Sequence, residues 1–154
     1  MLYRLALRIT LDSTESEDIV QETLIKVWNR REQWEQIESI EAFTLTICRN
    51  LSLDFLKKKE KRGDVEQMDS ETPDKSLNPY EHIIQKDRVQ AVKTIIDSLP
   101  EKQRSCVQLR DFEGKAYKEI ATILDITEQQ VKVNIFRARQ AIKQKFQEID
   151  NYGL

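Results

Sequence analysis

Apolar residues recur every three or four positions along most of this chain, the spacing that places them on one face of an α-helix. In the first part of the chain this pattern predicts three helices, over Leu2 to Leu11, Thr14 to Arg30 and Ser39 to Lys59. No stretch alternates apolar and polar residues as a half-buried strand does. The expected fold class is therefore all-α.

The same pattern predicts which helix faces are buried. Thr14 and Glu17 form a T-x-x-E capping box that would open the second helix. The buried stripe of that helix is expected to be Val20, Leu24 and Val27. The third helix repeats apolar residues on one side, at Ile40, Phe43, Ile47, Leu51 and Phe55, and has more on the other, at Leu45, Leu53 and Leu56. It should therefore be the central, most enclosed helix.

The last part of the chain is expected to end in a helix-turn-helix. Asn78 and Pro79 are a cap and first-turn pair for a helix with the stripe Val89, Val92, Ile96 and Leu99. Gly114 would end the helix that follows, because a left-handed residue is least costly when it is glycine. The other expected segments are a helix over Glu101 to Phe112, a helix over Tyr117 to Leu124, a turn of Asp125, Ile126 and Thr127, and a helix from Glu128 to about Ile149.

The stretch from Gly63 to Pro79, GDVEQMDSETPDKSLNP, has almost no periodic apolar residues and is rich in acidic and turn-forming ones. This composition is typical of a flexible linker. It divides the chain into two small helical domains, residues 1–62 and residues 80–154, joined by the linker 63–79. With 39 % hydrophobic and 34 % charged residues, the hydrophobic core, or cores, should be small.

The formal net charge of −2 would by itself argue against binding to nucleic acid. The charges are segregated, however. Acidic residues gather in Asp12 to Glu22 and Asp64 to Asp74, and basic residues in Lys57 to Arg62 and Lys132 to Lys145. This asymmetry indicates one surface for phosphate and another for a different partner.

The last helix has an apolar stripe, Val131, Ile135, Ala138 and Ile142, and a basic face with Lys132, Asn134, Arg137, Arg139 and Lys143. In a helix-turn-helix the second helix lies in the major groove, with its leading residues against base edges. The amides of Gln129, Gln130 and Asn134 could pair with adenine, and Val133 could contact a thymine methyl. Two alternatives remain open: a merely solvated basic helix, and a capping box of Thr127 with Gln130 that uses the same side chain.

The segment LPEKQRSCVQLRDFEGKAYKEIATILDITEQQVKVNIFRARQAI, from Leu99 to Ile142, resembles domain four of extracytoplasmic-function (ECF) sigma factors of the sigma-70 family. The resemblance implies binding to minus-thirty-five promoter DNA by Gln129, Gln130, Lys132, Val133, Asn134, Arg137 and Arg139. The chain departs from the family in having Asp125 where glycine is usual. Gln129, Gln130, Val133 and Asn134 also replace glycine, threonine, serine and arginine, so the family's base preference is not carried over.

The stretch EDIVQETLIKVW, from Glu17 to Trp28, is similar to the helix of sigma domain two that docks on the clamp coiled coil of RNA polymerase. The resemblance implies a polymerase-binding face made of Asp18, Gln21, Glu22 and Ile25. These residues stand at i, i+3, i+4 and i+7, on one side of a helix. A helix face that only contacts water would not require an apolar residue such as Ile25.

The stretch AFTLTICRNLSLDFLKKKEKR resembles the family segment that melts and reads the minus-ten element. The resemblance implies that this strand is bound by Arg49, Asn50, Asp54, Lys57 and Lys58. Trp34 falls where the family forms a pocket for a flipped base, but it could equally cover the core. Phe43 and Thr44 replace the family's usual tryptophan and leucine.

Together these resemblances imply a sigma factor that directs core RNA polymerase to promoter DNA, assists melting and has an anti-sigma partner. One alternative is a helix-turn-helix regulator that acts without polymerase. Another is a helical adaptor, which leaves the basic face of the last helix unexplained. Because the family's first helix normally begins further upstream, the N-terminus is expected to be shortened.

No enzyme is expected, since the chain has no Gly-rich phosphate loop and no nucleophile with a plausible base. No cofactor or metal is expected either. Cys48 and Cys106 are interpreted as small buried residues, and His82 is the only histidine. With neither a secretory signal nor a bilayer-spanning segment, the expected location is the cytoplasm, without membrane insertion.

Overall fold

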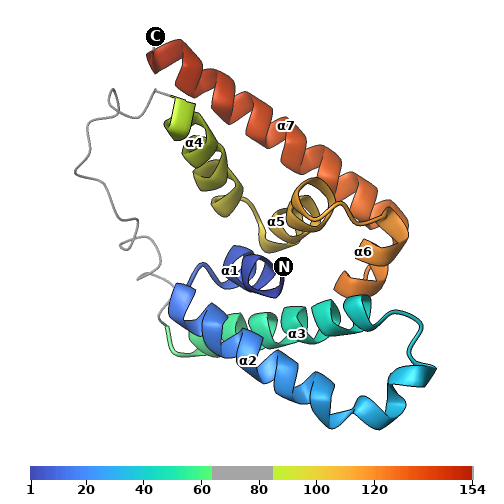
Figure 1. The fold of residues 1–154 in the computed structure, drawn as a ribbon. Coiled ribbons are helices and arrows are strands. Elements are labelled where there is room, and N and C mark those ends of the chain that lie inside the picture. Colours follow the sequence, from blue (N-terminus) through green and yellow to red (C-terminus); the bar gives the residue numbers. More distant parts are fainter. Residues whose placement is uncertain (64–84, 154) are drawn as a thin grey trace.

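The computed structural model describes residues 1–63 and 85–153, and within these ranges every regular element is helical (Figure 1). This confirms the all-α class. Most of the expected linker, and the expected Asn78–Pro79 helix start, lie outside the described residues. The elements are α1 (Leu2–Thr10), α2 (Ser13–Asn29), the 3₁₀ helix η1 (Arg31–Gln36), α3 (Ile40–Lys61), α4 (Gln85–Asp97), α5 (Glu101–Val107), the π-helical turn η3 (Gln108–Phe112), α6 (Tyr117–Leu124) and α7 (Glu128–Gly153).

Helix α2 begins earlier than its expected capping box. Its N-cap is Asp12, whose carboxylate accepts a hydrogen bond from the backbone N–H of Glu15 over 2.9 Å. The prediction of a cap at Thr14 was wrong because aspartate is a more favoured N-cap than threonine and lies two residues upstream. Helix α3 begins beside Ser39, as expected, and the Ser39 hydroxyl accepts a hydrogen bond from the N–H of Ala42 over 3.1 Å.

The buried face of α2 also differs from the expected stripe. Ile19, Thr23 and Val27 are buried, whereas the side chain of Leu24 is 53 % exposed. The hydroxyl of Thr23 donates to the backbone oxygen of Ile19 over 2.7 Å, so burial leaves no unpaired donor there. The apolar pattern missed this face because one of its members is polar.

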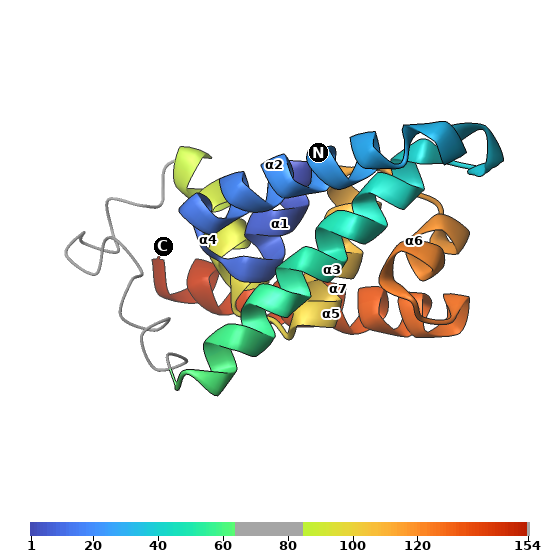
Figure 2. The same cartoon turned by 90° about the horizontal axis from the view of Figure 1, so that it is seen from below.

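Helix α3 is central, as expected, and packs against α1, α2 and α6 (Figure 2). Its fully buried residues are Leu45, Cys48 and Ser52, while the expected stripe from Ile40 to Phe55 is only partly buried or exposed. Cys48 lies against Ala6 and Ile19 of the first two helices. The opposite side of α3 packs on the second part of the chain, so both sides of the helix are covered.

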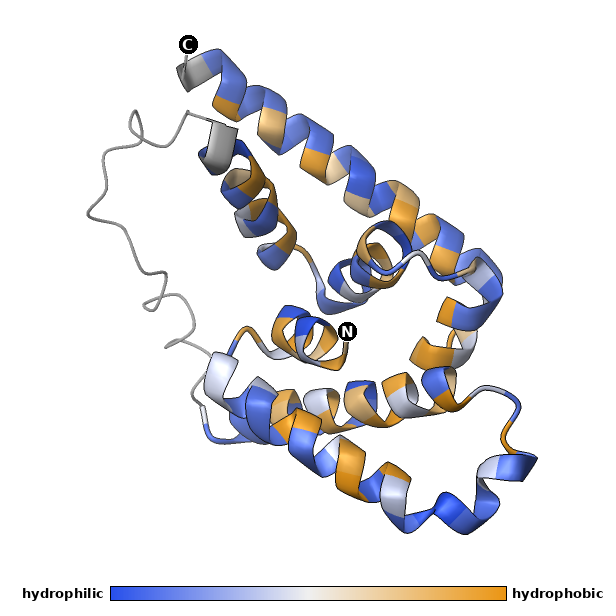
Figure 3. Cartoon of the chain, in the orientation of Figure 1, coloured by the Kyte–Doolittle hydropathy of each residue, from blue (hydrophilic) through white to orange (hydrophobic). Residues whose placement is uncertain are grey.

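The main hydrophobic core is shared by the first and second parts of the chain. Leu5, Ile9 and Leu45 from the first part join residues of α5 to α7 in one cluster. The second part contributes Cys106, Leu109, Ile120, Ile123, Leu124, Val131 and Ile135. Helix α1 contacts both α3 and α5, and α6 contacts both α3 and α7 (Figures 1 and 2). The two parts are therefore packed together, and hydrophobic residues occur along the helices on both sides of the contact (Figure 3).

The helix-turn-helix is confirmed as α6, a short turn and α7. Asp125 ends α6 in the left-handed region, with φ of 54°, where the family usually has glycine. Aspartate is one of the few other residues that tolerate this conformation. Gly114 has φ of 70°, which fits its expected role after η3.

Candidate polymerase and DNA interfaces

The four residues expected to bind polymerase, Asp18, Gln21, Glu22 and Ile25, are all exposed on α2. Leu24 and Trp28 extend this surface, and the three apolar side chains Leu24, Ile25 and Trp28 are 53 %, 59 % and 57 % exposed. We call the six residues together the α2 face. The sequence pattern missed Leu24 as a surface residue because it was assigned to the core. The α2 face is consequently more apolar than expected, with a carboxylate and amide rim.

Trp28 is held in place by its neighbours. The ring of Trp34 meets it edge to face, with centroids 6.0 Å apart. The guanidinium of Arg31 lies over it, 4.7 Å from the ring centroid. Trp34 itself is half-buried, and its indole N–H donates to the backbone oxygen of Val27 over 2.9 Å. Trp34 thus joins η1 to the end of α2, and its one hydrogen-bond donor is already used there.

Of the residues expected to bind the minus-ten strand, Asn50, Asp54, Lys57 and Lys58 are exposed on α3. Arg49 is half-buried and donates from Nη1 to the side-chain oxygen of Asn50 over 3.2 Å. Its Nε is buried and has no hydrogen-bond partner among the described residues. All five side chains therefore lie on α3, and the side chains of Arg49 and Asn50 are hydrogen-bonded to each other.

The basic end of α3 faces acidic residues of α2 across a groove of about 510 Å³. The α2 wall includes Asp12, Glu15 and Glu22, and the α3 wall Lys58, Lys59 and Arg62. Burial raises the pKa of Glu15, the nearby carboxylates of Asp18, Asp12 and Glu22 raise it further, and Lys58 opposes them. The positive charge of Lys58 is thus partly balanced within the protein.

The leading end of α7 carries the capping box expected as one alternative. Thr127 N–H donates to the side-chain oxygen of Gln130 over 2.9 Å, and Gln130 N–H donates to the Thr127 hydroxyl over 3.1 Å. The amide nitrogen of Asn134 donates to the backbone oxygen of Gln130 over 2.8 Å. Two of the three amides considered for adenine pairing are therefore engaged within the helix.

Exposed side chains on α7 form one continuous stripe, at Gln129, Lys132, Val133, Phe136, Arg137 and Gln140. We call this the outer stripe. Its members are spaced by three or four residues, so they share one side of the helix. Phe136, which is 63 % exposed, was not among the expected site residues. The sequence shows that Phe136 lies between the cations Lys132 and Arg137. It does not show whether the phenyl ring is exposed or part of the core, which only the tertiary structure decides.

Arg139 stands three residues after Phe136 and seven after Lys132, at the Lys132 edge of the outer stripe. Its guanidinium makes two hydrogen bonds to the Asp111 carboxylate, over 2.6 and 3.3 Å, and these raise the pKa of Arg139. It also lines an apolar groove of about 370 Å³ between α4, η3 and α7, with Phe112 and Phe146. Of the seven residues expected to bind the minus-thirty-five element, six are exposed on α7, Asn134 is half-buried, and Arg139 is paired with Asp111.

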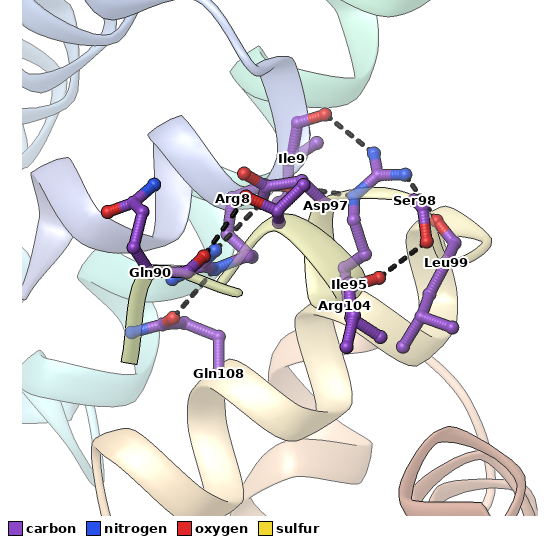
Figure 4. A network of polar contacts seen from close by, with 10 residues as sticks. Arg8, Ile9, Gln90, Ile95, Asp97, Ser98, Leu99, Arg104 and Gln108 are labelled. Carbon is purple, nitrogen blue, oxygen red and sulfur yellow. Dashed lines mark hydrogen bonds and ion pairs between the residues drawn. The ribbon is translucent and has the colours of Figure 1, made fainter. Parts of the chain in front are cut away.

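A buried arginine links the two parts of the chain (Figure 4). Arg104 in α5 donates to the backbone oxygens of Arg8, Ile9 and Leu99, over 2.8, 2.9 and 2.6 Å. Burial lowers the pKa of Arg104, while the carboxylates of Glu101 and Asp97 oppose this shift. The Arg8 side chain pairs with Asp97 over 2.7 Å, so α1 is joined to α4 as well as α5.

Two further ion pairs join the parts. Arg4 in α1 makes two hydrogen bonds to the Glu113 carboxylate, over 2.7 and 2.9 Å. The hydrogen bond from Arg4 is the main cause that lowers the pKa of Glu113. Lys115 pairs with Glu41 at the start of α3. Polar contacts therefore surround the shared apolar core.

Neither cysteine is expected to be reactive. Cys48 and Cys106 are both buried, and burial raises their pKa values to about 11 and about 12. A thiol with such a pKa is almost fully protonated near neutral pH and is a poor nucleophile. In residues 1–63 and 85–153 no group of His, Cys, Asp and Glu is arranged to hold a metal ion, and no helix is long and apolar enough to span a bilayer.

Comparisons with known proteins give a family match in each of the two parts of the chain. Residues 1–62 match the family model "Sigma-70 region 2", and residues 89–142 match "Sigma-70, region 4". The ECF RNA polymerase sigma factor SigL of Mycobacterium tuberculosis is 32 % identical over 151 residues, covering 97 % of this chain and 84 % of that protein. The ECF RNA polymerase sigma-E factor of Escherichia coli is 30 % identical over 144 residues, covering 88 % and 75 %.

Two other matches extend the comparison. A probable RNA polymerase sigma factor, RfaY of Xanthomonas campestris, is 29 % identical over 154 residues, and this chain spans only 38 % of its length. Among solved structures, the sigma factor RpoE in complex with the anti-sigma factor NepR, from Bartonella quintana, matches with a TM-score of 0.68. It shares 25 % sequence identity, and the match covers 97 % of this chain and 91 % of that one.

This chain therefore belongs to the sigma-70 family of RNA polymerase sigma factors, in its ECF group. The resemblance inferred from the sequence is confirmed in both parts of the chain. A helix-turn-helix regulator that acts without polymerase would explain the match to region 4 but not the match to region 2. The family match favours a sigma factor over that alternative.

Proposed function

We propose that this chain directs core RNA polymerase to promoters and assists promoter melting. The observation that carries this proposal is the presence, in one chain, of sigma-70 region 2 at residues 1–62 and region 4 at residues 89–142. We assign residues 1–62 to binding polymerase and the minus-ten strand, and residues 80–154 to binding the minus-thirty-five duplex. Polymerase supplies the chemistry, and this chain acts by binding, in the cytoplasm where polymerase works.

The α2 face is suited to a protein partner. Its centre is the apolar surface of Leu24, Ile25 and Trp28, and its rim is polar. Tightly bound protein interfaces commonly have such an aromatic or aliphatic centre surrounded by polar residues that exclude water. Trp28 is already fixed by Trp34 and Arg31, so little side-chain freedom is lost when a partner binds it.

The minus-ten residues we assign are Arg49, Asn50, Asp54, Lys57 and Lys58. Single-stranded DNA is held mainly by stacking and by a cationic groove. Lys57 and Lys58 lie at the basic end of α3, which supports this assignment. For the minus-thirty-five element we assign the outer stripe of α7, in which Lys132 and Arg137 are exposed on the two sides of Phe136.

The packed arrangement must open before both promoter elements can be bound. Helix α6 contacts both α3 and α7, and packed helices lie about 8–10 Å apart. The minus-ten and minus-thirty-five elements are centred about 25 base pairs apart, which is about 85 Å along the duplex. No arrangement in which α3 and α7 both pack on α6 spans that distance. Binding to polymerase therefore separates α3 from α6 in this proposal.

An anti-sigma factor is the second partner that we propose. The matched RpoE structure is a complex with the anti-sigma factor NepR, and this chain shares its fold over 97 % of its length. A partner that binds the packed form better than the open form would keep the chain inactive, because a ligand shifts an equilibrium only by its differential affinity.

The test is to mix the purified chain with core RNA polymerase and a promoter library, and to ask whether specific open-complex transcription begins. Trp28→Ala and Ile25→Asp should each weaken core binding at least tenfold, because both side chains are central to the α2 face. Val89→Ala is the matched control, since Val89 is equally exposed but lies on α4. Specific DNA binding without any association with core polymerase would contradict the proposal.

A further inference from the structure

The outer stripe of α7 presents apolar side chains where bases are expected to be read. Phe136 is 63 % exposed and Val133 is 38 % exposed. They stand three residues apart, so they are neighbours on one side of the helix. Phenylalanine normally buries most of its large surface, in a core or at an interface. Its exposure here indicates that a partner covers it when the protein functions.

The polar groups that would compete for base edges are largely occupied. Gln130 uses its side-chain oxygen to cap the helix, and Asn134 uses its amide nitrogen on the Gln130 backbone oxygen. Pairing both the oxygen and the nitrogen of either amide with an adenine edge at once would therefore compete with these hydrogen bonds. Past the leading turn of the helix, the outer stripe carries Lys132 and Arg137, which suit phosphate. Its other members there are Gln140 and the apolar side chains Val133 and Phe136.

The charges of the outer stripe identify the partner as nucleic acid. It includes Lys132 and Arg137 and no acidic residue, and its two remaining members are glutamines. Lys132 lies on one side of Phe136 and Arg137 on the other. An apolar surface between two cations, without a carboxylate, fits a polyanion with apolar groups between its phosphates. In the major groove the only such group on a base is the C5 methyl of thymine.

We propose that Val133 and Phe136 form a thymine-reading pair that sets the minus-thirty-five preference of this protein. This inference rests on the proposed function. Adjacent base pairs are about 3.4 Å apart and three helical residues rise about 4.5 Å, so the two side chains reach methyls on neighbouring base pairs. Specificity then comes from methyl contacts of Val133 and Phe136 rather than from the amides of Gln130 and Asn134.

The test removes the methyl groups one at a time. A promoter is first selected from a library with the full chain and core polymerase. Each thymine of its minus-thirty-five element is then replaced by deoxyuridine, which lacks only the C5 methyl. At one or two positions the replacement should weaken binding about fourfold, the effect of losing one buried methyl.

Protein variants identify which side chain contacts the methyl. In Phe136→Ala, one position should become insensitive to uracil, because its contact is already lost. Phe136→Leu should keep part of that sensitivity. Arg137→Ala, the matched control on the same stripe, should weaken binding while the uracil effect stays fourfold.

Equal uracil sensitivity in Phe136→Ala and in the unsubstituted chain would overturn the inference. Sequence-specific transcription that is indifferent to every thymine methyl would also overturn it, and would leave the proposed function standing. If the chain directs no promoter-specific transcription, the proposed function and this inference both fail. Exposure of Phe136 would then be assigned to a protein partner.

Discussion

Arg104 in α5 donates a hydrogen bond from Nη2 to the backbone oxygen of Ile9, near the C-terminal end of α1, over 2.9 Å. The last carbonyls of a helix have no partner within the helix, and a cation near them is favoured by the helix dipole. Arg104 satisfies two of these carbonyls, since Nε also donates to Arg8. A side chain of the second part of the chain thus completes a helix of the first part.

Arg104→Ala should lower the free energy of unfolding by about 3 kcal/mol, because it removes a buried charged donor and leaves carbonyls without partners. Arg104→Lys should restore only part of this loss, since an ammonium group cannot match the planar guanidinium that reaches three carbonyls. Urea unfolding followed by circular dichroism measures the change. Lys102→Ala, at an exposed position of the same helix, is the control. A loss below about 1 kcal/mol for Arg104→Ala would show that the network contributes little.

Acid should weaken the contact between α1 and η3 through Glu113. Its pKa is lowered from the ordinary value of 4.5 by the hydrogen bond from Arg4. A carboxylate with a lowered pKa stabilises the folded state fully above its ordinary value, and this contribution is lost as the pH falls through the folded pKa. Stability measured by urea unfolding should fall less between about pH 5 and about pH 3 in Glu113→Gln than in the unsubstituted chain. Glu119→Gln, at an exposed position of α6, should keep the original pH dependence.

Locking the two parts together should abolish promoter-directed transcription. Glu41 and Lys115 form an ion pair between α3 and the turn before α6, so Glu41→Cys with Lys115→Cys can be bridged by a short reducible crosslinker. The native cysteines should not react, because both are buried and their pKa values are raised to about 11 and about 12. Transcription should fall more than tenfold and return after reduction.

Each single cysteine variant treated with the same reagent serves as the control for the crosslink. Full transcription by the bridged chain would show that α3 and α6 stay in contact on the promoter. The opening of the packed form would then be excluded.

Arg137→Ala should weaken binding to all minus-thirty-five sequences alike and reduce the slope of log affinity against log salt by about 0.9, the value for one phosphate contact. Lys145→Ala provides the comparison, because Lys145 lies further along α7 and donates to Ser98 over 3.0 Å. Its slope should be unchanged. Fluorescence anisotropy over a salt series, with two unrelated promoters, makes the measurement. A loss confined to one promoter would instead assign base reading to Arg137.

Local features of the sequence were sufficient for much of the fold. The bounds of α6, the start of α3 near Ser39 and the left-handed Gly114 were predicted, and the capping box of Thr127 was one of two alternatives. Periodicity and capping involve residues only a few positions apart. The cap of α2 was missed because the T-x-x-E pattern of Thr14 and Glu17 was preferred over Asp12, although aspartate is the more favoured N-cap residue.

The candidate site was predicted less completely. The exposure of Leu24 and Phe136 was not foreseen, because a sequence pattern records which residues are apolar but not which of them find a partner. Gln130 and Asn134, which were expected to contact bases, each make a hydrogen bond within α7, and for Gln130 this capping was the alternative left open. A side-chain amide can bond either to its own helix or to a DNA base. The sequence alone does not say which of the two hydrogen bonds forms.

The sequence by itself determined the helices, the helix-turn-helix and the family to which the chain belongs. All of these depend on neighbouring residues and on motifs read along the chain. Only the tertiary structure decided that the two parts share one core and that Arg104 joins α5 to α1. Arg104 and Ile9 are 95 positions apart, and no periodic pattern in either segment specifies its partner at such a separation. Burial of both segments in one cluster creates that contact.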